Sequence, residues 1–184
     1  MRSAEDDMQI VIRGCIKNDR KAQELLYKRF YHAMMTLCVR YTKSSEDAME
    51  VMNDGFLKVF RNIGNYQPEK ASVYTWIRTI IIHTAIDFLR KQQAYPETSG
   101  FADGIEEPSI DNEALRRFSG EEVLGMIRQL PAATGLVFNL HAVDGFTHRE
   151  IGTLLGISEG TSRWHLSEAR KQLKIQIDLM NSNP

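Results

Sequence analysis

The sequence predicts an all-α protein with two small helical domains that a flexible linker joins. Apolar residues recur at spacings of three and four along most of the chain, as they do on one face of an α-helix. No stretch shows the strict alternation of apolar and polar residues that marks a β-strand. An acidic segment with two prolines and two glycines, residues 92–118, interrupts the helical pattern and separates residues 1–91 from residues 119–184.

The first domain begins with three predicted helices. Apolar stripes predict helices over residues 6–16 and 19–41. Ser44 and Asp47 have the spacing of a capping box, in which each side chain bonds the other residue's backbone N–H. This motif predicts a third helix that runs to about residue 62, with its apolar stripe facing the core.

A loop and a long helix complete the first domain. Residues 62–71 contain Gly64 and Pro68, which are typical of turns, so we expect a loop there. Ser72 is the expected N-cap of a helix that runs to Lys91. Trp76 and Phe88 are assigned to the apolar side of this helix, so we expect both in the core.

The second domain opens with two further predicted helices. Ser119 and Glu122 form a capping box, and Pro131 interrupts the helix that they start. The next apolar stripe continues to Gly145, where the helix should end.

A helix-turn-helix is predicted at the end of the second domain. Thr147 and Glu150 form a capping box, and Gly156 stands where a helix ends in a left-handed residue, so this helix has about two turns. Ser158 is the N-cap of the next helix, which we expect over residues 158–174. Two helices joined by a tight turn form the motif whose second helix enters the major groove of DNA. An ordinary helical hairpin with a solvated face is the alternative.

Only some segments of the chain carry the excess of positive charge that would attract an anionic partner. The 184-residue chain has a formal net charge of −1, with 42% hydrophobic and 26% charged residues. Residues 1–91 contain 15 Lys and Arg against 11 Asp and Glu, whereas residues 92–119 contain 2 against 6. The final helix, residues 158–174, contains 4 against 2. Positive charge is therefore local.

Cysteine usage and hydropathy set further expectations. Cys15 and Cys38 lie within apolar helical patterns and lack the spacing of metal ligands, so we expect reduced thiols in the core. The sequence shows no signal peptide and no run of about 20 apolar residues. We expect a cytoplasmic protein that does not insert into a membrane and holds no metal or cofactor.

Three motifs, in this order, resemble the extracytoplasmic-function group of the sigma-70 family. The segments DAMEVMNDGFLKVFRNI (47–63) and SVYTWIRTIIIHTAIDFLRK (72–91) are similar to region 2 of that family. The segment EIGTLLGISEGTSRWHLSEARKQL (150–173) is similar to region 4. The resemblance implies a factor that binds core RNA polymerase, recognises promoter DNA at −35 and −10 type elements, and opens the upstream edge of the bubble. It also implies an anti-sigma factor as a partner.

The resemblance assigns candidate site residues to three surfaces. For the upstream element these are Arg149, Ser158, Thr161, Arg163, Trp164, Ser167, Glu168, Arg170 and Lys171. For the downstream element they are Tyr66, Tyr74, Arg78, His83 and Arg90, and for polymerase binding Glu50, Asn53, Asp54 and Lys58. Arg163 is the expected base reader because a guanidinium can bond guanine through two hydrogens. His83 stands where the family usually has asparagine, and Trp164 is bulkier than the small residue often found there.

Two other classes of function share parts of this pattern. A one-component regulator, with an N-terminal helical ligand-binding domain and a C-terminal helix-turn-helix, would share this outline but would need a pocket and a dimer. An enzyme would have to use Asp87, Glu50 or some of the five histidines. The sequence offers no nucleophile with its base, no metal-ligand spacing and no glycine-rich phosphate loop, so we expect no catalytic residues.

Overall fold

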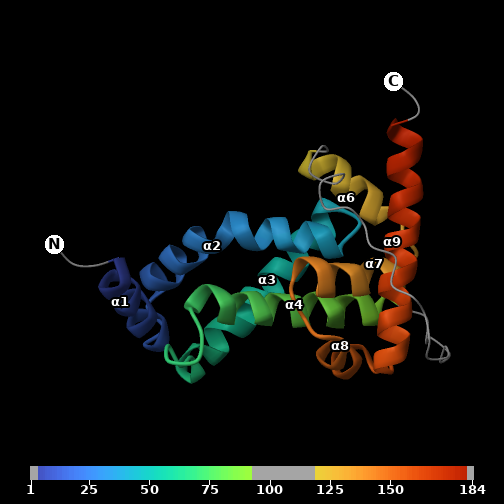
Figure 1. Cartoon of the computed structure of the whole chain (residues 1–184). Coiled ribbons are helices and arrows are strands. Elements are labelled where there is room, and N and C mark those ends of the chain that lie inside the picture. Colours follow the sequence, from blue (N-terminus) through green and yellow to red (C-terminus); the bar gives the residue numbers. More distant parts are fainter. Residues whose placement is uncertain (1–3, 93–118, 182–184) are drawn as a thin grey trace. The chain divides into compact units, whose positions relative to one another are not determined.

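The computed structural model describes residues 4–92 and 119–181, with the side chains of residues 7–92 and 119–180. In the first part, helices follow in the order α1 (Ala4–Ile16), α2 (Arg20–Tyr41), α3 (Ser45–Asn62), the 3₁₀ turn η1 (Ile63–Asn65) and α4 (Val73–Lys91) (Figure 1). The second part contains α6 (Gly120–Arg128), α7 (Ala132–Phe138), the π-helical turn η2 (Asn139–Val143), α8 (His148–Leu155) and α9 (Glu159–Asn181). No strand occurs in these two ranges, so the all-α prediction is confirmed.

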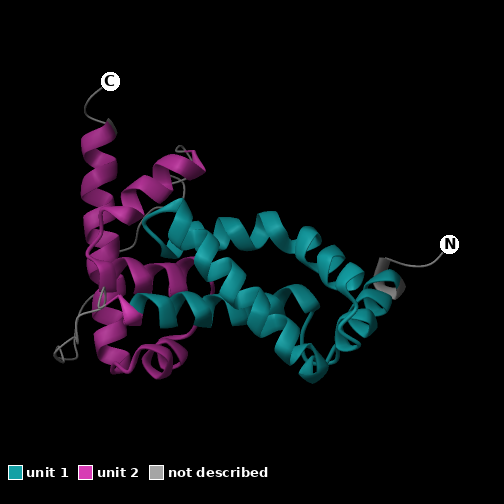
Figure 2. Ribbon diagram, turned by 180° about the vertical axis from the view of Figure 1, so that it is seen from behind, with its two compact units in different colours: residues 1–89 teal, residues 90–184 magenta. Residues whose placement is uncertain are grey.

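The chain forms two compact units that divide between residues 89 and 90, in the last turn of α4 (Figure 2). The predicted linker, residues 92–118, lies outside the described residues except for Gln92.

The core of the first unit lies between α1, α2, α3 and α4. α1 packs on α2, and α2 packs on α3. α3 and α4 approach closely at Gly55, where an added Cβ would lie 2.3 Å from the Ile81 Cδ1 atom. Fully buried side chains fill this space, among them Leu26, Met34, Met52, Phe56, Ile77, Ile81 and Ile82. Burying such side chains contributes about 1.5–3 kcal/mol each.

Side chains cap the starts of α2 and α3, and the second cap differs in part from the predicted one. Asp19 caps α2 by accepting the Lys21 backbone N–H at 2.8 Å. Ser44 caps α3 by accepting the Asp47 N–H at 3.0 Å. Among these described residues, the Asp47 carboxylate does not accept the reciprocal hydrogen bond from the Ser44 backbone N–H. The predicted capping box is therefore only half formed, because aspartate is one methylene shorter than the glutamate that usually completes it.

The second unit packs α7 and α8 against the long helix α9, and α6 against α7 and α9. Both predicted capping boxes, at Ser119 with Glu122 and at Thr147 with Glu150, are present. Their backbone hydrogen bonds hold the pKa of each glutamate below its ordinary value. The predicted helix that ends near Gly145 is α7 followed by η2, whose last bond joins the Asp144 N–H to the Asn139 carbonyl at 2.9 Å.

α9 is longer than the sequence predicts. Its helix continues beyond the expected end at residue 174 to Asn181. Ile177 is 3% exposed and extends the buried stripe that Leu173 occupies one turn earlier. Packing of this extra turn therefore prolongs the helix past its last clear sequence signal.

Both cysteines are free and buried, which confirms core thiols. Burial raises the pKa of Cys38 to about 12, because the thiolate loses its hydration. Within residues 4–92 and 119–181 no cluster of His, Cys, Asp and Glu side chains is placed to hold a metal ion. No helix in that part of the chain is long and apolar enough to cross a bilayer.

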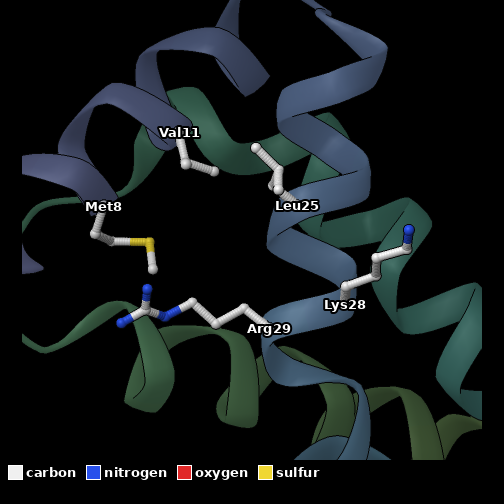
Figure 3. A pocket seen from close by; sticks show the side chains of 5 residues that line it. All are labelled: Met8, Val11, Leu25, Lys28 and Arg29. Carbon is white, nitrogen blue, oxygen red and sulfur yellow. The ribbon is translucent and has the colours of Figure 1, made fainter.

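A pocket of about 400 Å³ lies between α1 and α2. Figure 3 shows Met8 and Val11 of α1 facing Leu25 and Arg29 of α2, with the Arg29 guanidinium near Met8 and Lys28 pointing away. Lys28 Nζ is engaged instead by the Glu24 carboxylate at 2.5 Å. The lining is therefore apolar with a cationic edge.

Candidate DNA and polymerase interfaces

The predicted helix-turn-helix is present in α8, its turn and α9. Gly156 ends α8 in the left-handed region at φ +71°, and its N–H bonds the Gly152 carbonyl at 2.9 Å. Ser158 then caps α9, because its Oγ accepts the Thr161 N–H at 2.9 Å. The N-terminal turns of α9 therefore begin directly after the tight turn, as in a helix that enters the major groove.

One face of α9 carries basic side chains into solvent. Arg163 is 57% exposed and lies 3.6 Å from the Glu159 carboxylate, one turn earlier. Arg170 and Lys174 follow on the same face, seven and eleven residues further along the helix. Lys171 is exposed beside them, whereas Arg170 is half-buried. This face gathers the positive charge that the sequence placed in the final helix.

Two predicted upstream contacts are buried instead. Thr161 is 1% exposed, and its hydroxyl lies 2.9 Å from the Ser158 Oγ. Ser167 shares a face with Arg163 by its helical position, yet it is only 6% exposed. The helical pattern expects Thr161 to face inward, as it does, but puts Ser167 on an outward or flanking arc. That expectation is wrong for Ser167, because neighbouring packing covers a position that the helical period alone leaves open.

The other upstream candidates occupy different environments. Arg149 in α8 and Ser158 at the turn are exposed. Trp164 is half-buried, with its ring edge-on to His165 at a centroid distance of 4.9 Å. Glu168 is half-buried and accepts the Gln172 amide at 2.6 Å. In the free chain this carboxylate therefore has a partner on its own helix.

Acid should destabilise the second unit through His165, which is 4% exposed. Burial lowers the pKa of this imidazole below its ordinary value of 6.5, because the charged form is desolvated. Between the lower folded pKa and pH 6.5, the unfolded chain binds more protons than the folded one. The free energy of unfolding is therefore undiminished above that window and falls as the pH decreases through it.

This effect is measurable by circular dichroism melts between about pH 7.5 and 5.0. We expect the melting temperature of the second unit to fall with acid in the wild type, and His165→Gln to reduce that slope. His32→Gln, at an exposed histidine of α2, is the control. An unchanged slope in His165→Gln would contradict the assignment.

The downstream candidates separate onto two sides of α4. Trp76, His83 and Arg90 are spaced by seven residues and share one face. The Tyr66 ring lies 5.6 Å from the Trp76 ring, and the Tyr66 hydroxyl donates to the Ala71 carbonyl at 3.1 Å. The loop before α4 thus brings Tyr66 to the face that carries His83 and Arg90.

Tyr74 and Arg78 lie around the helix from His83. Tyr74 is 43% exposed, and its ring is 6.3 Å from that of Phe30 on α2. Arg78 is half-buried and follows Tyr74 by one turn. The five predicted residues therefore do not form one surface.

Trp76 and Phe88 correct the expectation that both belong to the core. Each is half-buried rather than buried. Residues such as Ile77 and Ile81 occupy the buried arc of α4, and Trp76 lies beside that arc. Sequence reasoning missed Trp76 as a functional candidate, although its seven-residue spacing from His83 was available.

The outer face of α3 holds the polymerase candidates. Glu50, Asn53 and Asp54 are exposed, and the Asn53 amide oxygen accepts the Tyr27 hydroxyl at 3.2 Å. Leu57 lies on the same face and is 52% exposed. It was missed because nothing in its residue type distinguishes an exposed leucine from a core one.

Lys58 is directed to α4 instead. Its Nζ lies 3.1 Å from an Asp87 oxygen, and the two side chains are 42% and 50% exposed. This pair joins α3 to α4 at the edge of the first unit. An exposed pair of this kind stabilises the fold by about 1 kcal/mol at most.

Comparisons with known proteins match both units. The model described as Sigma-70 region 2 matches residues 26–95, and the model described as Sigma-70, region 4 matches residues 120–173. Together they cover about two thirds of the chain.

Relatives match along nearly the whole length. The ECF RNA polymerase sigma-E factor of Escherichia coli strain K12 is 28% identical over 92% of this chain and 93% of its own length. The RNA polymerase sigma-H factor of Pseudomonas aeruginosa is 28% identical over 94% of each. CnrH, solved in complex with the cytosolic domain of CnrY, shares the fold with a TM-score of 0.50 and 16% identity, covering 95% of this chain and 97% of that one. The chain therefore belongs to the sigma-70 family of RNA polymerase sigma factors, in its extracytoplasmic-function group.

Proposed function

We propose how this sigma factor, which directs core RNA polymerase to promoters, divides its task along the chain. Residues 1–91 bind the polymerase and the downstream element, residues 92–118 connect, and residues 119–184 read the upstream element. The observation that carries the proposal is the helix-turn-helix whose second helix presents Arg163, 57% exposed, near its N-terminus.

Arg163 is the proposed base reader at the upstream element. Its present partner, the Glu159 carboxylate at 3.6 Å, is 51% exposed. Such exposed pairs are worth about 0–1 kcal/mol, so exchanging this partner for a guanine edge costs little. Exposed Arg149 and Ser158 are placed to hold phosphates, whereas buried Thr161 and Ser167 are not part of the proposed contact surface.

Replacing Arg163 and Arg149 separately tests this division. Arg163→Ala should lose about 1–3 kcal/mol and relax the preference at one base pair of the upstream element. Arg149→Ala should weaken all sequences alike and lower the salt slope by about one, because a phosphate contact releases a counterion without reading a base. Promoter selection from a randomised upstream element, followed by run-off transcription, measures both. Identical base preferences in all three proteins would reject α9 as the reader.

The same selection can test whether Glu168 contacts a base. Its carboxylate accepts from Gln172 in the free chain, which is the arrangement of a solvent-side pair. If it instead accepts from a cytosine amine in the complex, Glu168→Gln should tighten non-specific binding and blur one position. An unaltered preference would leave it as a helix-surface pair.

The face formed by Tyr66, Trp76, His83 and Arg90 is the proposed site for separated downstream bases. Aromatic rings stack on bases without regard to sequence, while polar and cationic groups hold edges and backbone. The Tyr66 and Trp76 rings, 5.6 Å apart, supply the stacking surface beside exposed His83. Capture of an unstacked base offsets the few kcal/mol that strand opening costs, so no hydrolysis is needed.

The remaining assignments follow from this role. The outer face of α3, with Leu57 among acidic and amide side chains, is the proposed polymerase contact. The proposed task requires no catalytic residue, metal or cofactor in this chain, and places it with the polymerase in the cytoplasm. We also propose an anti-sigma partner, which the complex of CnrH with the cytosolic domain of CnrY supports. The ligand-binding regulator is not favoured, since the matched relatives are sigma factors.

A further inference from the structure

The packing surface beneath α9 is polar as well as apolar. His148 Nδ1 lies 2.8 Å from Ser162 Oγ, and His165 Nδ1 lies 3.0 Å from Thr134 Oγ1. All four side chains are at most 8% exposed. Buried polar groups cost free energy unless they are hydrogen-bonded, so each pair depends on its partner being in place.

The two bonds tie α9 to two different helices. Ser162 is bound to the first residue of α8, and His165 is bound to α7. Both belong to the first two turns of α9, one residue before and two residues after Arg163. Apolar neighbours such as Leu166 hold α9 close but have no directional preference. Hydrogen bonds do have one, so rotating α9 about its axis would strain at least one pair.

The His148 ring is itself held from a third direction. It stacks on the His141 ring at a centroid distance of 4.3 Å and an interplanar angle of 14°. His141 Nδ1 lies 2.8 Å from the Phe146 carbonyl, which can only accept, so this nitrogen carries the hydrogen. A continuous series of contacts therefore leads from the turn before α8 through His141 and His148 to Ser162.

We propose that the His148–Ser162 and His165–Thr134 pairs set the rotation of α9 and thereby select which base the Arg163 side chain meets. They are positioning residues, because none of the four is on the surface. This inference rests on the proposed function of α9 as reader of the upstream element. It adds that sequence preference depends on buried hydrogen bonds that never contact DNA.

Thr134 allows a matched test. Thr134→Val keeps the shape and removes the hydroxyl, whereas Thr134→Ser keeps the hydroxyl and removes a methyl group. In the full-length protein with core polymerase, Thr134→Val should lose about five-fold in discrimination at the base pair read by Arg163. Thr134→Ser should retain wild-type discrimination. Affinity for non-specific DNA should be equal in all three, because the phosphate contacts are unchanged.

Ser162→Ala tests the second pair from the other side of α9. It should relax the same base pair, and its combination with Thr134→Val should relax it further than either alone. Circular dichroism melts establish that each variant is folded at the assay temperature. If Thr134→Val does not fold, the Ser162→Ala result decides the question.

Arg163→Ala in the same selection distinguishes the positioning role of the buried pairs from the base-reading role of Arg163. Relaxed preference in Arg163→Ala with wild-type preference in folded Thr134→Val and Ser162→Ala overturns the positioning role and leaves the reader intact. Equal relaxation in Thr134→Ser and Thr134→Val also overturns it, because volume rather than the hydrogen bond would then matter. An unchanged preference in Arg163→Ala overturns both proposals.

Discussion

Replacing Gly152 with alanine should destabilise the second unit by about 1–3 kcal/mol and abolish recognition of the upstream element. A Cβ at this position would lie 2.8 Å from the Ile157 carbonyl oxygen and 3.9 Å from the Glu159 nitrogen. Both are backbone atoms of the turn, so no side-chain rotation can relieve the contact. The beginning of α9 would have to move, and Arg163 would move with it.

Gly125→Ala is the matched control for this substitution. Gly125 lies inside α6 of the same unit, and an added Cβ there meets nothing within 4 Å. Because alanine favours helix more than glycine, this change should be neutral or stabilise by up to about 1 kcal/mol. Thermal melts and upstream-element binding measure both variants. A Gly152→Ala protein with wild-type stability and binding would contradict this prediction, because the turn would then accommodate the added Cβ without moving α9.

Leu57→Ala should weaken binding to core RNA polymerase roughly thirty-fold, which corresponds to about 2 kcal/mol at an interface hot spot. Leu57 is 52% exposed on a face that also carries Glu50, Asn53 and Asp54. An apolar side chain beside polar ones is usual in a protein interface. Asn53→Ala with Asp54→Ala should weaken binding further through the rim.

A titration with labelled core polymerase measures this loss, and transcription should fall equally at every promoter. Leu25→Ala is the control, because Leu25 is a similarly exposed leucine, at 58%, on α2 beside the pocket. Neither change should alter the melting temperature by much, since both side chains already contact water. Equal affinities for Leu57→Ala and wild type would remove the outer face of α3 from the interface.

The elements that could be predicted from the sequence rest on local chemistry. Three features define the helix-turn-helix: the capping box of Thr147 with Glu150, the left-handed Gly156 and the cap at Ser158. Each of them joins residues that lie no more than four positions apart. Their hydrogen bonds form wherever the helix forms, so the helix-turn-helix and its boundaries could be predicted without any neighbour.

The environment of single side chains could not be predicted in this way. Ser167 was expected outside and is buried, while Trp76 was expected inside and is half-exposed. Leu57 was passed over although it is more than half exposed. A helical period tells which residues share a face, but the width of the covered arc depends on how many helices pack against it.

By itself, the sequence determined that this protein is helical, where most of its helices begin and end, and which segments resemble a sigma factor. Tertiary structure alone decided which candidate residues share a surface. It joined His165 to Thr134 across 31 positions and His148 to Ser162 across 14, and it placed Gly152 against the backbone of the turn. Such contacts exist only once helices distant in sequence have packed, because hydrogen bonds and close contacts act over a few ångströms, whatever the spacing along the chain.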